Sequence, residues 1–529
     1  MKSQSTLRAV SFLPFLSLAL AACSSTDPID EPGAGGTAGT SGATAAGGAG
    51  TGGVAGTAGK GGTAGTGNVS GAAGFGTGGT SGSSGAAGAS TGGTGVGGAG
   101  AGSGGVSGAG AGGVGPGGAG AGGVGPGGAG AGGGSGSGAS GAGAGGGGAG
   151  LPEGGYPENT GAGCDVTAGD QADNDNLPDP FAMNDGTRIT TKAQWACRRN
   201  EIKKDIEKYE IGTKPEPPMV EASLNGTTLT VEVSTSDGSL TLSSTVGMAS
   251  GSGPHCVAIG MNGNAGLISG CIQIPFRHDQ VVGYNNGGGS QNQGDPFYDV
   301  YPNLWQQIGN YNAWSWGISR LIDGIEQVKD ELNVDMSRIG IQGCSYAGKM
   351  ALFGGAFDER VALTVAQESG GGGITSWRTS QNFTSRTGTN IEKIDNTNYA
   401  WFKSSMRQLD PYSLPHDHHE LIAMIAPRAV IALGNPEYEW LGDESGYKSV
   451  MAAKEVFKAL GVEANLGFDF TGNHAHCQAP SQQQQSTTAF VNKFLKGMDA
   501  NTSIAIQPSG NGFQLDPSDV IDWDTPTLQ

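Results

Sequence analysis

Residues 343–349 read Gly-Cys-Ser-Tyr-Ala-Gly-Lys and lie between an apolar run, residues 339–341, and a helix-like stretch, residues 350–357. The pattern predicts a strand, a tight turn flanked by glycines and a helix, with Ser345 on the turn. A serine hydroxyl is a poor nucleophile until a base removes its proton, and such a turn lifts the Oγ atom clear of the backbone. The stretch therefore predicts a serine nucleophile of the kind that esterases use.

Strand-like and helix-like runs alternate around this turn. Alternating or β-branched runs predict strands at residues 228–233, 240–246, 257–259, 339–341, 363–366, 429–433 and 466–469. Apolar residues recur at helical spacing at residues 313–332, 349–357 and 449–460. The alternation predicts an α/β-hydrolase fold, a three-layer sandwich in which helices cover both faces of a mainly parallel sheet. The first two runs, joined by Ser236-Asp237-Gly238, predict an antiparallel hairpin at the edge of that sheet.

The segment before residue 151 has a composition that cannot form a core. Of the 529 residues, 102 are glycine, and most of these lie before Gly155. Residues 23–150 are dominated by Gly, Ala, Ser and Thr, and a ten-residue unit that starts at Ala111 is repeated at Ala121. We expect a disordered linker here, because such a chain buries too little apolar surface to fold. All eight tryptophans lie in residues 151–529, which we expect to form one catalytic domain.

The N-terminal residues have the profile of a signal peptide. Lys2 and Arg8 precede an apolar stretch, residues 9–20. The four residues Leu20-Ala21-Ala22-Cys23 then supply a cleavage site of small residues. The last four residues resemble a bacterial lipobox, in which the cysteine is lipidated. We therefore expect residues 1–22 to be a lipoprotein-type signal peptide and Cys23 to carry a lipid anchor on an extracytoplasmic protein, at the outer membrane or cell surface, or secreted. The alternative is an ordinary secretory signal with an incidental cysteine.

The charge of the chain limits its partners. The formal net charge is −19 and falls almost wholly on residues 151–529. Because a negative surface repels polyanions, we expect no nucleic acid partner, and an acidic sugar would need a local positive site. We expect a monomer with no cofactor, which contacts a membrane through its N-terminal lipid anchor alone.

Two runs contain metal-ligand residue types. His416-Asp417-His418-His419 offers imidazoles and a carboxylate that zinc accepts, and Asp173-Asn174-Asp175-Asn176 is similar to part of a calcium loop. The second run lacks the glycine and the final glutamate of an EF-hand. Clustered residues need not converge on one ion, so we expect no metal at either run, with zinc at the first as the alternative.

Candidate partners for the serine follow it in the chain. In an α/β-hydrolase the order is serine, then aspartate or glutamate, then histidine. Glu368 comes directly after a predicted strand, and His476 lies in a loop after the last predicted strand. His476 would accept the proton of Ser345 and return it to the leaving alcohol, while Glu368 would hold the imidazole tautomer and stabilise the imidazolium.

The cysteines indicate an oxidising compartment. Apart from Cys23, an even set of six remains, and an exported chain with such a set is expected to form three disulfides. The spacing alone leaves fifteen connectivities open. The six residues are Cys164, Cys197, Cys256, Cys271, Cys344 and Cys477.

Residues 177–495 resemble the glucuronoyl esterases, carbohydrate esterase family fifteen. The family turn reads Gly-Cys-Ser-Arg-x-Gly-Lys, and residues 343–349 match it except at Tyr346. Further matching blocks are Asp185-Gly186-Thr187, Trp195-Ala196-Cys197-Arg198-Arg199, Ala313-Trp314-Ser315-Trp316-Gly317, Gln367-Glu368-Ser369-Gly370, Trp377-Arg378, Asp417-His418-His419, Ala426-Pro427-Arg428 and Trp440-Leu441-Gly442.

The resemblance implies a catalytic set and three disulfide pairs. Ser345 would be the nucleophile, Glu368 the acid and His476 the base, with Tyr346 at the oxyanion position, where the family has an arginine. The implied disulfide pairs are Cys344 with Cys477, Cys164 with Cys197, and Cys256 with Cys271. Loss of the arginine charge would weaken the oxyanion site, although the backbone N–H of Tyr346 remains available.

The resemblance also implies a substrate and its contacts. The family cleaves the ester between 4-O-methyl-glucuronic acid of glucuronoxylan and a lignin alcohol, through an acyl-enzyme. Lys349 and Trp440 match positions that contact the sugar, whereas Asn390 and Asn398 stand near positions where the family has Gln and Glu. The alternatives are an esterase for another carbohydrate or aryl ester, and a carbohydrate-binding surface protein with weakened catalysis.

Overall fold

The computed structural model describes residues 157–285, 291–510 and 512–529. The predicted signal peptide at residues 1–22, the lipidation site Cys23 and the linker at residues 23–150 lie outside the described residues. Within the described ranges, no helix is both long enough and apolar enough to cross a membrane.

Parallel strands form the central layer of the described chain. The sheet has seven strands in the order β10-β9-β8-β7-β6-β4-β5, and every neighbouring pair is parallel. The strands are β4 His255–Met261, β5 Ile272–Phe276, β6 Val334–Cys344, β7 Val361–Gln367, β8 Ala429–Leu433, β9 Leu466–Asp469 and β10 Ala505–Ile506. The predicted strands at residues 257–259, 339–341, 363–366, 429–433 and 466–469 all belong to this sheet.

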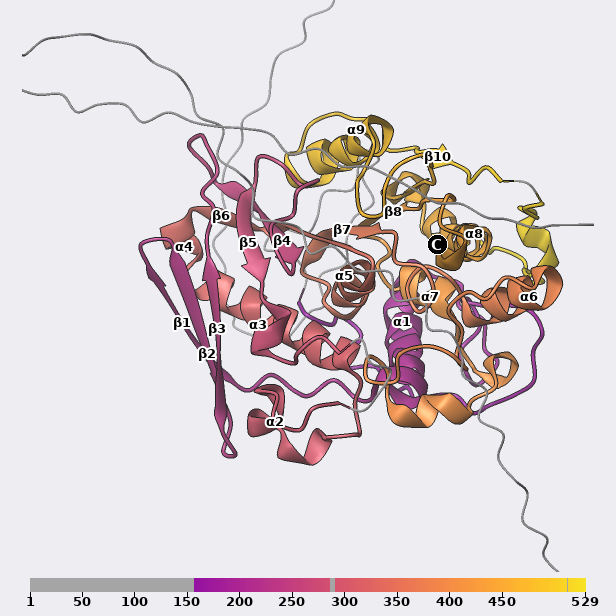
Figure 1. Ribbon diagram of the computed structural model, residues 1–529, viewed down its shortest axis with the longest axis horizontal. Coiled ribbons are helices and arrows are strands. Elements are labelled where there is room, and N and C mark those ends of the chain that lie inside the picture. The colour runs from indigo at the N-terminus through magenta and orange to yellow at the C-terminus, as the bar shows by residue number, and fades with distance from the viewer. Residues whose placement is uncertain (1–156, 286–290, 511) are drawn as a thin grey trace, which may run out of the picture. The chain divides into compact units, whose positions relative to one another are not determined.

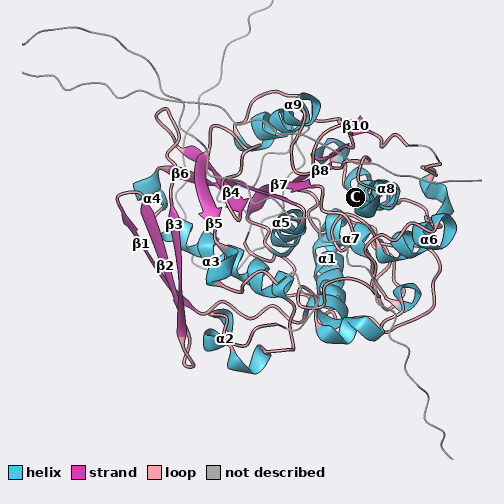
Figure 2. Cartoon of the chain, viewed as in Figure 1, coloured by secondary structure: helices cyan, strands magenta, loops and turns pink. Residues whose placement is uncertain are grey.

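Helices cover the sheet on both faces, as the cyan ribbons around the magenta strands in Figure 2 show. The α-helices are α1 Lys192–Ile206, α2 Phe297–Val300, α3 Asn310–Gln327, α4 Lys329–Leu332, α5 Tyr346–Phe357, α6 Trp377–Thr387, α7 His418–Ala423, α8 Asp443–Ala459 and α9 Ser481–Phe490. Two π-helical turns, Glu207–Ile211 and Val491–Leu495, continue α1 and α9. In Figure 1, α9 lies on one side of the strands and α3, α5 and α7 lie on the other.

The alternation of side chains along each strand builds two cores. In β8, Val430 and Ala432 pack in the core that contains residues of α3, α5 and α7, whereas Ile431 and Leu433 pack with Phe490 of α9. Successive side chains of a strand point to opposite faces, so a fully buried strand must be apolar on both sides. This explains the uninterrupted apolar run of β8, and it confirms the predicted α/β-hydrolase layout with its three layers.

The predicted edge hairpin is wrong in its placement. Its two strands, β2 Thr228–Ser234 and β3 Ser239–Thr245, do pair antiparallel, but with β1 Met219–Asn225 they form a separate three-stranded sheet. Alternate residues of β2, including Val231, are buried, and Val231 reaches α3 so closely that a Cβ atom on Gly324 would lie 2.3 Å from it. The hairpin therefore covers α3 instead of extending the main sheet.

Two predicted helix boundaries also need correction. The run at residues 313–332 is split into α3 and α4 at Val328, whose φ of −108° and ψ of 17° depart from helical values. The run at residues 449–460 belongs to the longer α8, which begins at Asp443 directly after the left-handed residue Gly442. Asp443 and Glu444 lie in the first turn of α8, where acidic side chains interact favourably with the positive end of the helix dipole. Because these residues are polar, the spacing of apolar residues did not predict this start of the helix.

Candidate active site

Ser345 lies on the turn between β6 and α5, as the sequence predicts. Its backbone has φ 59° and ψ −129°, a conformation that residues other than glycine rarely adopt. A Cβ atom on Gly343 would lie 2.0 Å from the carbonyl oxygen of Ala347, and one on Gly348 would lie 2.4 Å from that of Gln367. Only glycine fits at these two positions, so the spacing of the glycines is what permits the sharp turn under Ser345.

Glu368 follows β7 and lies beside the loop that carries His476. Its carboxylate is buried, with 1% of the residue exposed, and Oε2 lies 2.6 Å from Nδ1 of His476. Oε1 accepts the backbone N–H of Cys477 at 3.1 Å, and the side-chain amide of Asn435 donates to Oε2 at 3.4 Å. The carboxylate is therefore oriented by donors from two other loops, as a buried charge requires.

The structure distinguishes His476 from its neighbour His474. Nδ1 of His474 lies 3.8 Å from Glu368, and its Nε2 lies 2.8 Å from the carbonyl oxygen of Thr471. His476 makes the short contact with Glu368 and keeps a partly exposed side chain. Since Nδ1 of His476 is used by the carboxylate, Nε2 is the ring atom available to a hydroxyl group.

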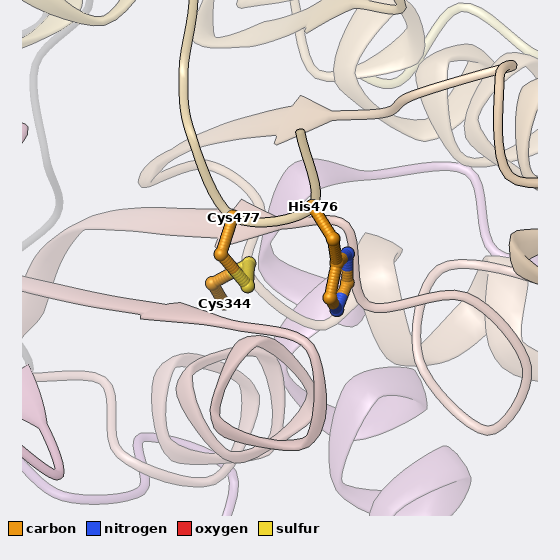
Figure 3. A group of neighbouring side chains, drawn as sticks. All are labelled: Cys344, His476 and Cys477. Atoms are coloured by element: carbon orange, nitrogen blue, oxygen red, sulfur yellow. A yellow bond between two sulfur atoms is a disulfide. The ribbon is translucent and has the colours of Figure 1, made fainter. Parts of the chain in front are cut away.

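The loop of His476 is held on two sides. Its backbone N–H donates to the hydroxyl of Tyr438 at 3.1 Å, and its ring lies edge-on to Trp440 with 4.9 Å between centroids. A disulfide joins Cys477, the next residue, to Cys344, the residue before Ser345. Figure 3 shows this bond beside the His476 ring.

The disulfides use all the cysteines of the described chain. The pairs are Cys344–Cys477, Cys256–Cys271 and Cys164–Cys197, the three that the family resemblance implies. Nitrogen and sulfur atoms of His476, Cys344 and Cys477 lie within 4.8 Å of one another, a spacing that could hold a metal. Both sulfurs are bonded to each other, so no thiolate is available as a ligand.

A cavity of about 370 Å³ opens beside Ser345. Five other residues singled out in the sequence also line it: Glu368, Lys349, Trp440, Asn390 and Asn398. Lys349 is 5% exposed, and its ammonium forms an ion pair with Glu392, a cavity residue that the sequence reasoning missed. The sequence did contain a signal for Glu392, because its carboxylate side chain comes only two residues after Asn390, which had been singled out.

The run at His416 forms a buried hydrogen-bond network. Nε2 of His416 and Nε2 of His418 lie 2.8 and 2.9 Å from the two carboxylate oxygens of Glu210, and Nε2 of His419 lies 2.9 Å from the carbonyl oxygen of Pro178. The nearby imidazoles of His418 and His416 hold the pKa of the Glu210 carboxyl well below its usual range. These rings link α7 to the chain around Glu210.

The sequence matches known proteins over most of the described chain. The profile of a family described as "Glucuronyl esterase, fungi" matches residues 231–461. A 4-O-methyl-glucuronoyl methylesterase of Thermothelomyces thermophilus is 40% identical over 338 residues, which cover 62% of this chain and 83% of that protein. A 4-O-methyl-glucuronoyl methylesterase of Schizophyllum commune is 39% identical over 367 residues, which cover 67% of this chain and 92% of that protein. The chain belongs to the glucuronoyl esterase family.

Solved structures of glucuronoyl esterases support the same family assignment. The catalytic domain from Hypocrea jecorina has a TM-score of 0.63 and 37% identity, covering 68% of this chain and 98% of that one. A mutant of the Sporotrichum thermophile enzyme has been solved in complex with methyl 4-O-methyl-β-D-glucopyranuronate. It has a TM-score of 0.63 and 36% identity, and the match covers 69% of this chain and 100% of that one. As a member of the glucuronoyl esterase family, the protein is a carboxylic-ester hydrolase.

Tyr346 is where this member departs from the arginine expected of a glucuronoyl esterase. Its side chain is not among the residues that line the cavity. Its hydroxyl accepts a hydrogen bond from the side-chain amide of Asn262 at 2.9 Å and lies 3.1 Å from Nε2 of His278. Its ring packs 4.2 Å from that of Tyr284, between centroids. Burial raises the pKa of the Tyr346 phenol to about 12, so this side chain supplies no charge in place of the arginine.

Asn390 and Asn398 reach the cavity, but their side chains also form bonds within its wall. The amide oxygen of Asn398 accepts the backbone N–H of Ala400 at 3.0 Å, and its amide nitrogen donates to the carbonyl oxygen of Asn285 at 2.5 Å. The amide oxygen of Asn390 accepts from Asn396 at 3.0 Å. These contacts stabilise the loop that forms the cavity wall, and they occupy groups that a ligand would otherwise use.

Proposed function

We propose that the protein hydrolyses the ester between 4-O-methyl-glucuronic acid of glucuronoxylan and a lignin alcohol, with Ser345 as nucleophile, His476 as base and Glu368 as acid. The observation that carries this proposal is the 2.6 Å contact of His476 with buried Glu368, on a loop bonded covalently to the residue before Ser345. The relatives named above support the substrate class, since they are called 4-O-methyl-glucuronoyl methylesterases.

In the first half of the reaction, Nε2 of His476 takes the proton of Ser345 and Oγ attacks the ester carbonyl carbon. The negative charge that develops on the carbonyl oxygen is stabilised by the backbone N–H of Tyr346, the first residue of α5, where helix N–H groups have no partner within the helix. Glu368 stabilises the imidazolium. Collapse of the intermediate breaks the bond to the alcohol, which leaves with the proton from His476.

In the second half, water replaces the alcohol. His476 takes a proton from the water, the hydroxide attacks the acyl carbon bonded to Ser345, and the same N–H stabilises the oxyanion. The bond to Oγ then breaks, His476 returns the proton to Ser345, and the free uronic acid leaves. Lys349 and Trp440, with Asn390 and Asn398, would form the side of the cavity that binds the sugar.

The three disulfides support an extracytoplasmic location, because such bonds persist in oxidising compartments. We further propose a signal peptide at residues 1–22, a lipid anchor on Cys23 and a tether over residues 23–150 that holds a monomeric catalytic domain, residues 151–529, away from the membrane. Mass spectrometry of the mature N-terminus tests the anchor: an unmodified Cys23, or cleavage elsewhere, would exclude it.

The activity is tested by assaying the purified chain on benzyl glucuronate and on acetylated xylan, beside Ser345→Ala. We expect hydrolysis of the glucuronate ester that Ser345→Ala abolishes. A higher rate on acetylated xylan would favour an esterase for another carbohydrate ester. Hydrolysis that does not depend on Ser345, or none on any ester, would contradict the proposed enzyme and favour a binding protein.

A further inference from the structure

Another cavity, of about 150 Å³, lies between α6, the loop after β8 and the C-terminal segment. The described residues that line it are all different from those around the cavity beside Ser345. Each of the three segments contributes one aromatic residue to its wall, namely Phe383, Tyr438 and Phe513. A cavity of about this volume can hold one six-membered aromatic ring.

The polar groups of this cavity favour a positively charged ligand. Asp443 and Glu439 supply carboxyl groups to its wall, and the described residues that line it include no lysine, arginine or histidine. Arg386 lies 5.5 Å from the centroid of the Phe383 ring, but its guanidinium is paired with Glu444. Since no basic side chain of the wall neutralises the two carboxyl groups, a cation is attracted and an anion is repelled.

Asp443 has an acceptor position that no protein group uses. The residue is 4% exposed, and its Oδ2 accepts the backbone N–H of Asn435 at 2.8 Å. Within the described residues Oδ1 accepts no hydrogen bond, although the side chain borders the cavity. A buried carboxylate with an unfilled acceptor is costly, and burial accordingly raises the pKa of the Asp443 carboxyl to about 7. An N–H donor on a bound cation would fill this position and favour the ionised form.

The aromatic wall is held in place before any ligand binds. The hydroxyl of Tyr438 accepts the backbone N–H of His476 at 3.1 Å. The segment of Phe513 is held at the next residue, where the backbone N–H of Gln514 donates to Glu444 at 2.9 Å. Organic ammonium ions bind to the faces of aromatic rings, and a wall that is already ordered lowers the entropic cost of binding them.

Two other kinds of ligand fit this cavity less well. A divalent metal takes about six or more oxygen ligands, whereas the wall supplies two carboxyl groups. A neutral sugar requires donors as well as acceptors from the protein. The hydroxyl of Thr387, however, already donates to the carbonyl oxygen of Phe383 at 2.8 Å and accepts the backbone N–H of Thr389 at 3.1 Å.

We propose that this cavity is a binding site for a small organic ammonium ion, whose N–H group donates to Oδ1 of Asp443 and whose apolar group, about one ring in size, lies among Phe383, Tyr438 and Phe513. The exposed carboxylate of Glu439 adds long-range attraction. The site is separate from the catalytic centre and does not depend on the proposed function.

Benzylammonium and benzyl alcohol test the proposal, because they have nearly the same shape and differ in charge. In calorimetry at pH 8 we expect the full chain to bind one benzylammonium with a Kd of about 1 mM, as befits so small a ligand. Benzyl alcohol should bind at least about 10-fold more weakly, since it lacks the charge-assisted hydrogen bond.

Variants place the ligand in this cavity. Asp443→Asn and Phe513→Ala should each weaken benzylammonium binding by about 10-fold or more, through the lost charge and the lost aromatic face. Glu437→Gln is the matched control, since Glu437 is exposed on the same loop and does not line the cavity. Glu392→Gln controls for binding in the cavity beside Ser345. Thermal unfolding checks that each variant folds, and Phe513→Ala, at a partly exposed position, still tests the site if Asp443→Asn is unstable.

The pH dependence of binding identifies the group that meets the cation. Benzylammonium keeps its charge from pH 6 to pH 8, whereas at pH 6 most of the Asp443 carboxyl carries a proton that must leave before the ion pair forms. The affinity should therefore be about 10-fold lower at pH 6 than at pH 8, and this difference should vanish in Asp443→Asn. That variant separates Asp443 from the other charged or titratable groups nearby, which are Glu368, Arg386, Glu439, Glu444, Lys448 and His474.

Four outcomes would overturn the inference. The first two are no binding heat up to about 10 mM benzylammonium and an equal affinity for benzyl alcohol. The third is an affinity that stays unchanged in both Asp443→Asn and Phe513→Ala. The fourth is a loss of binding in Glu392→Gln alone, which would place the ligand in the cavity beside Ser345.

Discussion

The disulfide between Cys344 and Cys477 joins the residue before Ser345 to the residue after His476. The two cysteines are 133 residues apart in the chain, and their Cα atoms lie 5.7 Å apart. Rates of reactions between positioned groups depend steeply on their separation, so this bond restricts the drift of the loop that carries His476 relative to the turn of Ser345.

We expect Cys344→Ala/Cys477→Ala to lower kcat more than its loss of stability explains. Removal of a disulfide across so long a loop should cost about 2–5 kcal/mol in the free energy of unfolding, and loosening of the catalytic loop should lower kcat by about 10²-fold. Cys256→Ala/Cys271→Ala is the matched control, since that bond lies between β4 and β5, away from the cavity. Equal kcat values in the two double variants, measured well below their melting temperatures, would exclude a catalytic role for the first bond.

Glu368→Gln should lower kcat by about 10³–10⁴-fold with a small change in KM. The variant keeps the shape of the side chain but loses the negative charge that, in the proposed mechanism, stabilises the imidazolium of His476, whose Nδ1 lies 2.6 Å from Glu368. Steady-state kinetics on benzyl glucuronate measure this, with Glu437→Gln, an exposed position on the loop after β8, as the control. A loss of less than about 10-fold would show that Glu368 is not the catalytic acid.

Tyr346→Phe should change kcat by less than about 3-fold, because the phenol hydroxyl bonds Asn262 and His278 and the side chain does not line the cavity. It should lower the free energy of unfolding by about 1 kcal/mol.

Tyr346→Arg should raise kcat on a glucuronate ester, since an added oxyanion donor is worth about 10²–10³ in rate. Unchanged or lower turnover in Tyr346→Arg would show that Tyr346 does not weaken the oxyanion site.

Asp443 should make the stability of the protein depend on pH. Burial, and then the charge of Glu368, raise the pKa of the Asp443 carboxyl to about 7, although Oδ2 accepts the backbone N–H of Asn435 at 2.8 Å. Between about pH 4 and pH 7 the native state keeps a proton that the unfolded chain has lost, so the stability from this group falls as the pH rises through that window.

Asp443→Asn tests this dependence, because its amide oxygen can still accept from Asn435. We expect the variant to gain stability relative to the unsubstituted protein as the pH rises from about 4 to 8, by at most about 1.4 kcal/mol per unit of difference in pKa. Urea unfolding at several pH values measures the difference, with Asp237→Asn, at an exposed turn, as the control. Parallel curves for Asp443→Asn would show that the native carboxyl is already ionised.

Local rules in the sequence were sufficient to predict the Ser345 turn and the five strands β4, β6, β7, β8 and β9 of the main sheet, but they did not identify β5 or β10. The glycines at 343 and 348 are required because backbone atoms within five residues, or on the next strand, leave no room for a Cβ atom. The apolar run of β8 coincides with the observed strand, since burial on both faces requires apolar side chains throughout. Periodicity could not place the β2–β3 hairpin, because its partner sheet is decided by contacts with α3.

The sequence by itself thus determined the fold class, the Ser345 turn and the residue types of a catalytic set. Only the tertiary structure decided that His476, and not His474, pairs with Glu368, and that Lys349 pairs with Glu392. The physical reason is the range of the contacts involved. Strand and turn patterns arise between neighbours in the chain, whereas these contacts join segments far apart in sequence, where burial and hydrogen-bond geometry select among chemically similar side chains.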